Sequence, residues 1–181
     1  YNHFGDSFLL GLWIIQVNIN NSIFINNYAL IGAAIYKKED GVWAAGSGII
    51  NNSFFIENTA NNYAAAIHYE ATGYGEFGFS QLEIDNSVFS YNITENSITD
   101  RGALIDTYTG FRVNDESGEY NSLDLPLILN NNHFFSNTGE GTALLYSRYF
   151  EGENNSFKNN ISSYLTRIIH KLTFTREIPG G

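Results

Sequence analysis

One seven-residue pattern returns five times along this chain: an Asn, a Phe three residues later, and a second Asn three residues after the Phe. The copies are Asn21-Ser-Ile-Phe24-Ile-Asn-Asn27, Asn52-Ser-Phe-Phe55-Ile-Glu-Asn58, Asn86-Ser-Val-Phe89-Ser-Tyr-Asn92, Asn131-Asn-His-Phe134-Phe-Ser-Asn137 and Asn154-Asn-Ser-Phe157-Lys-Asn-Asn160. Their leading Asn residues are 31, 34, 45 and 23 positions apart. A motif that recurs at such periods indicates stacked repeats, each in contact with its neighbours, rather than a globule around one central core.

The residues around each copy read as three short strands separated by corners. A short apolar or alternating run precedes the leading Asn, a strand carries the Phe, and small and aliphatic residues follow the second Asn. These later groups are Gly32-Ala-Ala-Ile35, Ala64-Ala-Ala-Ile67, Gly102-Ala-Leu104 and Gly141-Thr-Ala-Leu144. The pattern predicts an all-β fold, a right-handed parallel β-helix (a pectin-lyase-like solenoid) of about six rungs. An antiparallel sandwich with Asn-rich hairpins is the alternative, but it would not bring the motif back in phase.

The Asn and Phe residues have different expected roles. Asn tolerates the left-handed backbone region, so it suits tight corners, and amides stacked at one corner can donate to one another. Side chains at equivalent positions of successive rungs should form interior columns. One column is expected at Phe24, Phe55, Phe89, Phe134 and Phe157, and a second at Ile35, Ile67, Leu104 and Leu144.

Three of the four intervals between motifs are longer than the last one, 23 residues, which is about the length of a bare rung. Residues 37–45, 70–80 and 107–124 all fall between the small-aliphatic strand and the next strand, so we expect them to leave the coil from one corner. Repeat proteins concentrate insertions, and recognition with them, on one face. Aromatic residues there are candidate recognition residues for glycans, with local packing as the alternative. They are Trp43, Tyr74, Phe77, Tyr108 and Phe111.

These paired motifs resemble a known repeat family. Phe-x-x-Asn alternating with Gly-Gly-Ala-Ile/Leu/Val is the signature of the polymorphic outer-membrane protein repeats of chlamydia-type autotransporters. The first motif occurs five times here, whereas each copy of the second lacks at least one glycine. The resemblance covers roughly residues 18–162 and implies a β-helix displayed at a cell surface as an adhesive or structural passenger. Because the motif residues are structural, it implies no catalytic residue.

Composition limits the function further. The net charge is −10, with 19 acidic and 9 basic residues, which disfavours a nucleic-acid partner. No apolar run reaches the length of a membrane span, and the absence of Cys excludes disulfides and thiolate metal sites. Residues 1–181 are expected to form a single β-helix domain. The first residue is not Met and Asn2-His-Phe4 resembles the start of a rung, so we expect a segment of a longer or polymeric protein.

Sites of modification and catalysis are few. Among the Asn-x-Ser/Thr sequons, Asn20 and Asn51 are the candidates for glycosylation, because the others occupy positions expected to pack in ladders. The densest charged group, Asp100, Arg101 and Asp106, is the fallback site if the chain is an enzyme, but its favoured interpretation is solvated loop charges and one surface ion pair. His68 is expected to point outward as a lone surface residue. Histidine spacing indicates no metal site, and no cofactor motif is present.

The sequence therefore favours a non-enzymatic extracellular or cell-surface module, structural or adhesive, as part of a fibre or layer. Its expected partners are copies of itself, end to end or side by side, or further chain, and glycans. A carbohydrate-active β-helix, either a polysaccharide lyase or hydrolase or a glycan-binding module, is the alternative.

Overall fold

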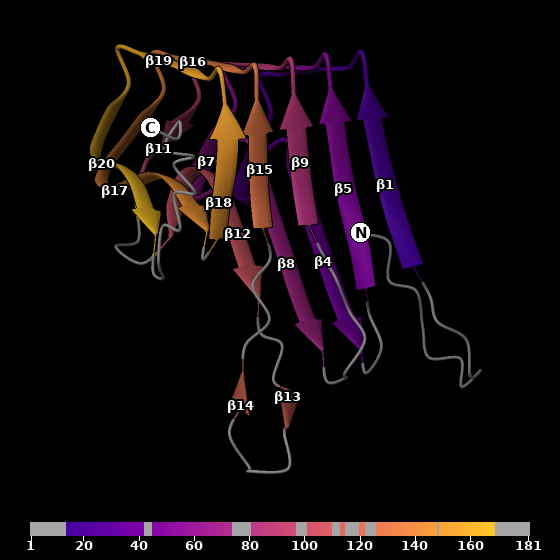
Figure 1. Ribbon diagram of the computed structural model, residues 1–181. Helices are drawn as coiled ribbons and strands as arrows, with labels where there is room; N and C mark the ends of the chain where they lie inside the picture. The colour runs from indigo at the N-terminus through magenta and orange to yellow at the C-terminus, as the bar shows by residue number, and fades with distance from the viewer. Residues whose placement is uncertain are drawn as a thin grey trace, which may run out of the picture.

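The computed structural model describes residues 14–41, 45–73, 81–96, 101–109, 113–114, 120–121, 126–147 and 149–168. These residues form strands that coil into five stacked rungs (Figure 1). The first rung is β1 (Ile14–Asn20), β2 (Ile23–Ile25), β3 (Tyr28–Ile31) and β4 (Ile35–Gly41). The second is β5 (Ala45–Asn51), β6 (Phe54–Ile56), β7 (Thr59–Tyr63) and β8 (Ile67–Gly73). The third is β9 (Gln81–Asp85), β10 (Val88–Ser90), β11 (Ile93–Thr94) and β12 (Gly102–Thr109).

The last two rungs have three strands each. The fourth is β15 (Pro126–Asn130), β16 (His133–Phe135) and β17 (Thr138–Ser147), and the fifth is β18 (Tyr149–Glu153), β19 (Ser156–Lys158) and β20 (Ile161–Ile168). Between the third and fourth rungs, β13 (Val113–Asn114) and β14 (Tyr120–Asn121) form an antiparallel hairpin. Among the described residues there is no helix with the length and hydropathy to cross a bilayer.

Every pairing between rungs is parallel. The first faces form the sheet β1-β5-β9-β15-β18, visible in Figure 1 as a row of arrows, and the second faces form β2-β6-β10-β16-β19. The third sheet runs β3-β7-β11-β17-β12-β8-β4, with β20 paired to β17. The predicted parallel β-helix is therefore confirmed. The described residues, which do not include 1–13 and 169–181, contain five rungs, against the about six expected for the whole chain.

The third face bends sharply. In the first two rungs three small residues split it into two strands, and in the third rung residues 95–101 separate β11 from β12. In the fourth rung β17 passes through the bend as one strand, with a register shift between Gly139 and Ala143. Gly32, at the bend of the first rung, has a φ of 61°. The prediction of three strands per rung is thus correct only for the last two rungs. The bend creates a concave corner on the outside of the coil.

Two left-handed residues shape each second face. All five leading Asn residues have positive φ, between 47° for Asn86 and 56° for Asn131 and Asn154, as the corner prediction requires. The residue before each second Asn is also left-handed, with φ of 54° or 55°, although the sequence varies there. These residues are Asn26, Glu57, Tyr91, Ser136 and Asn159. The sequence predicts a corner at the second Asn, but the varied residue before it gives no local indication of its left-handed conformation.

The second Asn of each motif forms an amide ladder, as predicted. The backbone N–H and the Nδ2 of Asn92 both donate to Oδ1 of Asn137, at 3.1 and 2.8 Å, and Nδ2 also donates to the Phe55 carbonyl at 2.9 Å. The ladder runs through Asn27, Asn58, Asn92, Asn137 and Asn160. Since Asn92 and Asn137 are buried, these bonds satisfy groups that would otherwise lie unpaired in the interior.

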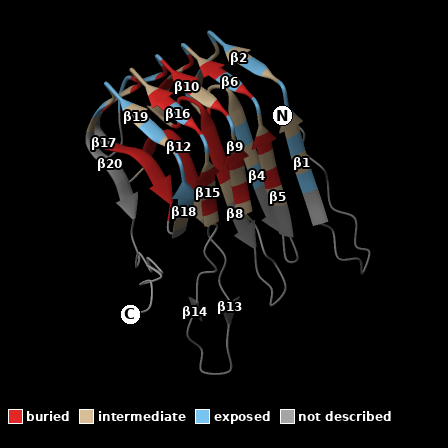
Figure 2. Cartoon of the chain, turned by 45° about the horizontal axis from the view of Figure 1, so that its top comes forward, coloured by how far each residue is buried: buried red, intermediate tan, exposed pale blue. Residues whose placement is uncertain are grey.

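The Phe column is confirmed. Neighbouring rings lie 4.6–4.9 Å apart with interplanar angles of 2–12°. Phe55, Phe89 and Phe134 are fully buried, and Figure 2 shows burial concentrated in these middle rungs. Phe24 and Phe157, in the first and last rungs, are only half-buried.

Two members of the second column lie one position later in the chain than predicted. Ile35 and Ile67 pair in register with each other, but Ile67 pairs with Ile105, and Ile105 pairs with Leu145. The predicted members Leu104 and Leu144 are buried as well, one position earlier at the bend. Backbone bonds from Ala64 to Gly102 and from Ala66 to Leu104 fix this pairing with a constant offset, which places Ile105 rather than Leu104 beside Ile67.

The edge from which the insertions leave agrees with expectation. Strands β4, β8 and β12 are neighbours, and so are the strands β5, β9 and β15 that follow the insertions, so the strand ends that flank the three insertions lie at one edge of the coil (Figure 1). Part of each predicted insertion is strand: β4 extends to Gly41, β8 to Gly73 and β12 to Thr109.

Candidate functional site

A buried charged cluster lies at the concave corner of the third face. His68 on β8 and Asp106 on β12 are register partners, and their side chains are 1% and 0% exposed. Ile67 and Tyr69, on either side of His68 in β8, belong to the interior core. Since side chains alternate along a strand, His68 faces the outside of the coil. The prediction that His68 is a surface residue is nevertheless wrong.

The bend explains why an outward side chain is buried. Glycines at the bend bring backbone directly over the column that contains Tyr36, His68, Asp106 and Tyr146. A Cβ added to Gly32 would lie 3.1 Å from Cβ of His68, and one added to Gly102 would lie 2.9 Å from Cβ of Tyr146. The small residues therefore allow the chain to fold over its own outer surface.

Asp106 is the centre of the cluster. Its Oδ2 accepts from Nδ1 of His68 at 3.0 Å and from the guanidinium of Arg101 at 3.2 Å, and its Oδ1 accepts from the backbone N–H of Gly102 at 2.8 Å. The carboxylate is thus held by a cation, an imidazole and a backbone donor. Such pairing is what permits a carboxylate to be fully buried.

Arg101 covers this carboxylate from the solvent side. Its guanidinium lies 4.9 Å from the ring centre of Tyr63 and 4.5 Å from that of Tyr108. Burial lowers the pKa of Arg101, but the charge of Asp106 and the neighbouring Tyr63 outweigh it, so the net shift is upward. The pKa of Tyr63 is raised mainly by burial, with Arg101 opposing and Asp106 adding to the shift.

The second ring nitrogen of His68 has no hydrogen-bond partner among the described residues. It lies 3.6 Å from a carboxylate oxygen of Glu70, whose other oxygen lies 3.6 Å from Nζ of Lys38. Because a carboxylate only accepts, the Nδ1 of His68 that faces Asp106 carries a proton. Basic and acidic side chains thus alternate from Arg101 through Asp106, His68 and Glu70 to Lys38.

Such an aspartate–histidine pair resembles a general base, but it is closed to a substrate. The rings of Tyr36 and Tyr63 lie 5.0 and 5.3 Å from the His68 ring. A base must come within hydrogen-bond reach of the proton it removes, directly or through one water. With His68 and Asp106 buried, the cluster is arranged to tie the second and third rungs together rather than to meet a substrate.

The structure places the predicted acidic site only in part. Arg101 and Asp106 come together as expected, while Asp100 lies outside the described residues. Sequence reasoning missed His68 as the third member. The available signal was its position, because His68 and Asp106 each directly follow the aliphatic residue of the second column. No group of three or more His, Cys, Asp or Glu among the described residues could hold a metal ion.

Of the five predicted aromatic recognition residues, only Tyr108 lies within the described residues. Tyr108 is half-buried against Arg101 and is not a freely exposed platform. Trp43, Tyr74, Phe77 and Phe111 lie outside the described residues, so their shared recognition surface stays a prediction.

The two glycosylation candidates lie one above the other on the first sheet. Asn20 pairs in register with Asn51, and Nδ2 of Asn51 donates to Oδ1 of Asn20 at 3.2 Å. Asn20 is exposed and Asn51 half-buried, so Asn20 is the more accessible of the two for attachment, whereas the Nδ2 of Asn51 already donates to its neighbour. Attachment of a glycan stays a prediction.

A shallow hollow lies on the outer surface of the second sheet. Tyr91, 52% exposed, packs edge-on against Phe135 with ring centres 5.5 Å apart. Polar groups surround these rings, and Nδ1 of His133 lies 2.7 Å from the hydroxyl of Ser156. The lining is Val88, Tyr91, His133, Phe135, Ser136, Ser156, Lys158 and Asn159.

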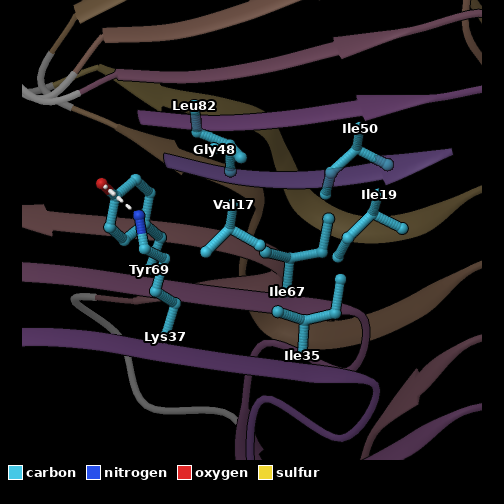
Figure 3. Close-up of a pocket in the computed structure, with 9 residues that line it drawn as sticks. All are labelled: Val17, Ile19, Ile35, Lys37, Gly48, Ile50, Ile67, Tyr69 and Leu82. Carbon is cyan, nitrogen blue, oxygen red and sulfur yellow. Dashed lines mark hydrogen bonds between the residues drawn. The ribbon is translucent and has the colours of Figure 1, made fainter. Parts of the chain in front are cut away.

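A second cavity lies inside the coil and is too small for a ligand. It measures about 20 Å³, room for one water at most, and aliphatic side chains from the first rungs surround it (Figure 3). Lys37, expected in a surface insertion, points into this interior, where its Nζ donates to the Tyr69 hydroxyl at 2.9 Å. The alternation of β4 turns Lys37 inward because Ile35 is inward.

Comparisons of this chain with protein-family models, curated proteins and solved structures find no match.

Proposed function

We propose that this chain is an extracellular structural or adhesive module that associates with copies of itself in a surface fibre or layer. The observation that carries the proposal is that the second Asn and the Phe of each motif bond or stack with their counterparts in neighbouring rungs. Their amides bond from rung to rung and their rings stack through all five rungs. The motif therefore builds a rigid scaffold, and the described charged cluster at the corner is buried within it.

The resemblance to the polymorphic outer-membrane protein repeats supports display at a cell surface. It rests on the two tetrapeptide motifs, and no family model matches the chain. The excess of 19 acidic over 9 basic residues is compatible with a soluble surface layer, because net charge keeps such modules apart until specific contacts form.

Electron microscopy and light scattering of the purified protein test the proposal. Fibres, layers or a rise in scattering mass with concentration are expected. A strictly monomeric protein at all concentrations would contradict self-association.

An acidic-polysaccharide cleavage assay, with and without calcium, tests the enzymatic alternative. No cleavage is expected. Cleavage that disappears in a folded Asp106→Asn protein would replace the structural proposal by an enzymatic one.

Glycan binding is a second candidate function, favoured by the hollow around Tyr91. An exposed aromatic ring beside hydroxyl, imidazole and amine groups offers both a stacking face and hydrogen-bonding groups for a sugar. Tyr91→Ala should abolish retention on a glycan array or affinity column. Tyr28→Ala is the matched control, because Tyr28 is 65% exposed and lies outside the hollow. Equal retention by both variants would contradict this candidate.

A further inference from the structure

We infer that copies of this chain stack head to tail, with the first rung of one copy on the fifth rung of the next and the hydrogen-bond register continued across the junction. This inference rests on the proposed self-association and specifies its partner surface and direction.

The amide ladder has a direction. From rung to rung, the backbone N–H and Nδ2 of one Asn donate to Oδ1 of the next: Asn27 to Asn58 at 3.1 and 2.7 Å, and Asn137 to Asn160 at 3.0 and 2.9 Å. Within the described residues the ladder begins with Asn27, whose Oδ1 receives no ladder bond, and ends with Asn160, whose backbone N–H makes none. One end therefore presents an acceptor and the other presents donors.

A second ladder on the other side of the Phe strand has the same direction. The backbone N–H of Ser22 donates to the Ser53 hydroxyl at 3.3 Å, and that of Asn132 donates to Oδ1 of Asn155 at 3.0 Å. Two parallel ladders thus distinguish the ends of the coil, whereas the edges of parallel strands carry both N–H and C=O groups and distinguish them much less.

Head-to-tail contact completes the ladders. Asn160 of one copy would donate from its backbone N–H and Nδ2 to Oδ1 of Asn27 in the next. Nδ2 of that Asn27 would donate to the Phe157 carbonyl, as Nδ2 of Asn160 donates to the Phe134 carbonyl at 2.9 Å. Contact between two like ends would instead place acceptor against acceptor or donor against donor.

Burial shows that both end rungs have open interior faces. Phe24 and Phe157 are half-buried, although their counterparts Phe55 and Phe134 are 0% exposed. Ile19, in the first rung, is likewise half-buried, while its register partner Ile50 is 2% exposed. Stacking Phe157 on Phe24 of the next copy would cover two ring faces at the spacing already present inside the coil.

Charge favours the same direction. The register that links Asn20, Asn51, Asp85, Asn130 and Glu153 would place Glu153 of one copy against Asn20 of the next. An amide can donate to a carboxylate, so the Nδ2 of Asn20 suits the carboxylate of Glu153 in this arrangement. Such a head-to-tail contact does not close on itself and produces a filament.

Single cysteines test the direction. Ile23 and Ser156 are the outward first and last members of the column that contains Phe54, Val88 and His133, and would become neighbours across the junction. Both are exposed and the chain contains no Cys, so Ile23→Cys and Ser156→Cys introduce one thiol each without entering the core. One variant carries a size tag, and the two are mixed and oxidised mildly.

The mixture should give disulfide-linked heterodimers at about a hundredfold the level of homodimers from either variant alone, because docking raises the effective thiol concentration from micromolar toward millimolar. Val88→Cys, in the same column but the third rung, replaces either partner as the control and should give no excess. The double variant Ile23→Cys/Ser156→Cys should give a ladder of oligomers.

The outcomes separate the inference from the proposal beneath it. Suppose that scattering shows self-association, but that homodimers predominate, that Val88→Cys cross-links as well, or that heterodimers show no excess. Any of these results would overturn the head-to-tail inference and leave the structural proposal standing. A monomeric wild-type protein, including one whose own remaining residues cover the end rungs, would overturn both.

Discussion

The adjacent residues Phe54 and Phe55 permit a direct test of the interior stack. Both lie on β6, but Phe55 is 0% exposed and points inward, whereas Phe54 is 43% exposed and points outward. The Phe55 ring lies 4.9 Å from Phe24 and 4.6 Å from Phe89, with interplanar angles of 6° and 2°. Phe55→Ala therefore removes the contact between three successive rungs.

The expected loss follows from this geometry. Truncation of a buried Phe typically costs about 3–5 kcal/mol of unfolding free energy, including the cavity that remains. Two stacked aromatic pairs are lost together, and each is worth about 0.5–1.5 kcal/mol beyond the area it buries. The rigid backbone ladders on both sides hinder collapse of the cavity, so we expect about 4 kcal/mol for Phe55→Ala. Phe54→Ala, which removes a partly solvated ring, should cost about 1 kcal/mol.

Urea unfolding followed by circular dichroism measures the difference. For a chain of this size, about 4 kcal/mol corresponds to a fall in melting temperature of about 10 °C. Circular dichroism before unfolding establishes that each variant retains its β-structure. Equal losses for Phe54→Ala and Phe55→Ala would refute the inward assignment of the stack, and a loss below about 1 kcal/mol for Phe55→Ala would refute its tight packing.

Three further predictions concern the ladder, the bend and the corner. Asn137→Asp should lower the unfolding free energy by about 3 kcal/mol at pH 7. The loss should be smaller at pH 4, because burial raises the folded-state pKa of the new carboxyl. The control Asn154→Asp, at an exposed position, should show little change in the same urea melts. Gly102→Ala should cost about 2 kcal/mol, since a Cβ presses on the backbone of the bend, whereas Gly48→Ala meets only the end of a side chain and should cost under about 1 kcal/mol in the same melts. Burial raises the pKa of Tyr63 above 10.0. The contribution of Tyr63 to the unfolding free energy is therefore complete below pH 10 and is lost as pH rises through the folded-state pKa. Tyr63→Phe should lose less stability than the wild-type protein when melts are taken at alkaline pH, and an equal loss would contradict this.

The candidate site illustrates how far local sequence reasoning reaches. Arg101 and Asp106 are close in the chain, so their pairing was accessible from the sequence. His68 lies 38 residues before Asp106 and contacts it only because β8 and β12 are adjacent in register. The burial of all three depends on the bend, which converts an outward strand face into an enclosed corner.

What the sequence alone determined is the architecture: parallel rungs, left-handed leading Asn residues, amide ladders and the Phe column. These features repeat with the motif, because one rung translated onto the next places identical groups in contact. The tertiary structure alone decided the pairing that places Ile105 rather than Leu104 beside Ile67, the left-handed conformation of Glu57 and Tyr91, and the extension of β4 that turns Lys37 inward. These depend on how the small residues bend each rung and on the backbone bonds between neighbouring rungs, which impose a conformation whatever the local residue prefers.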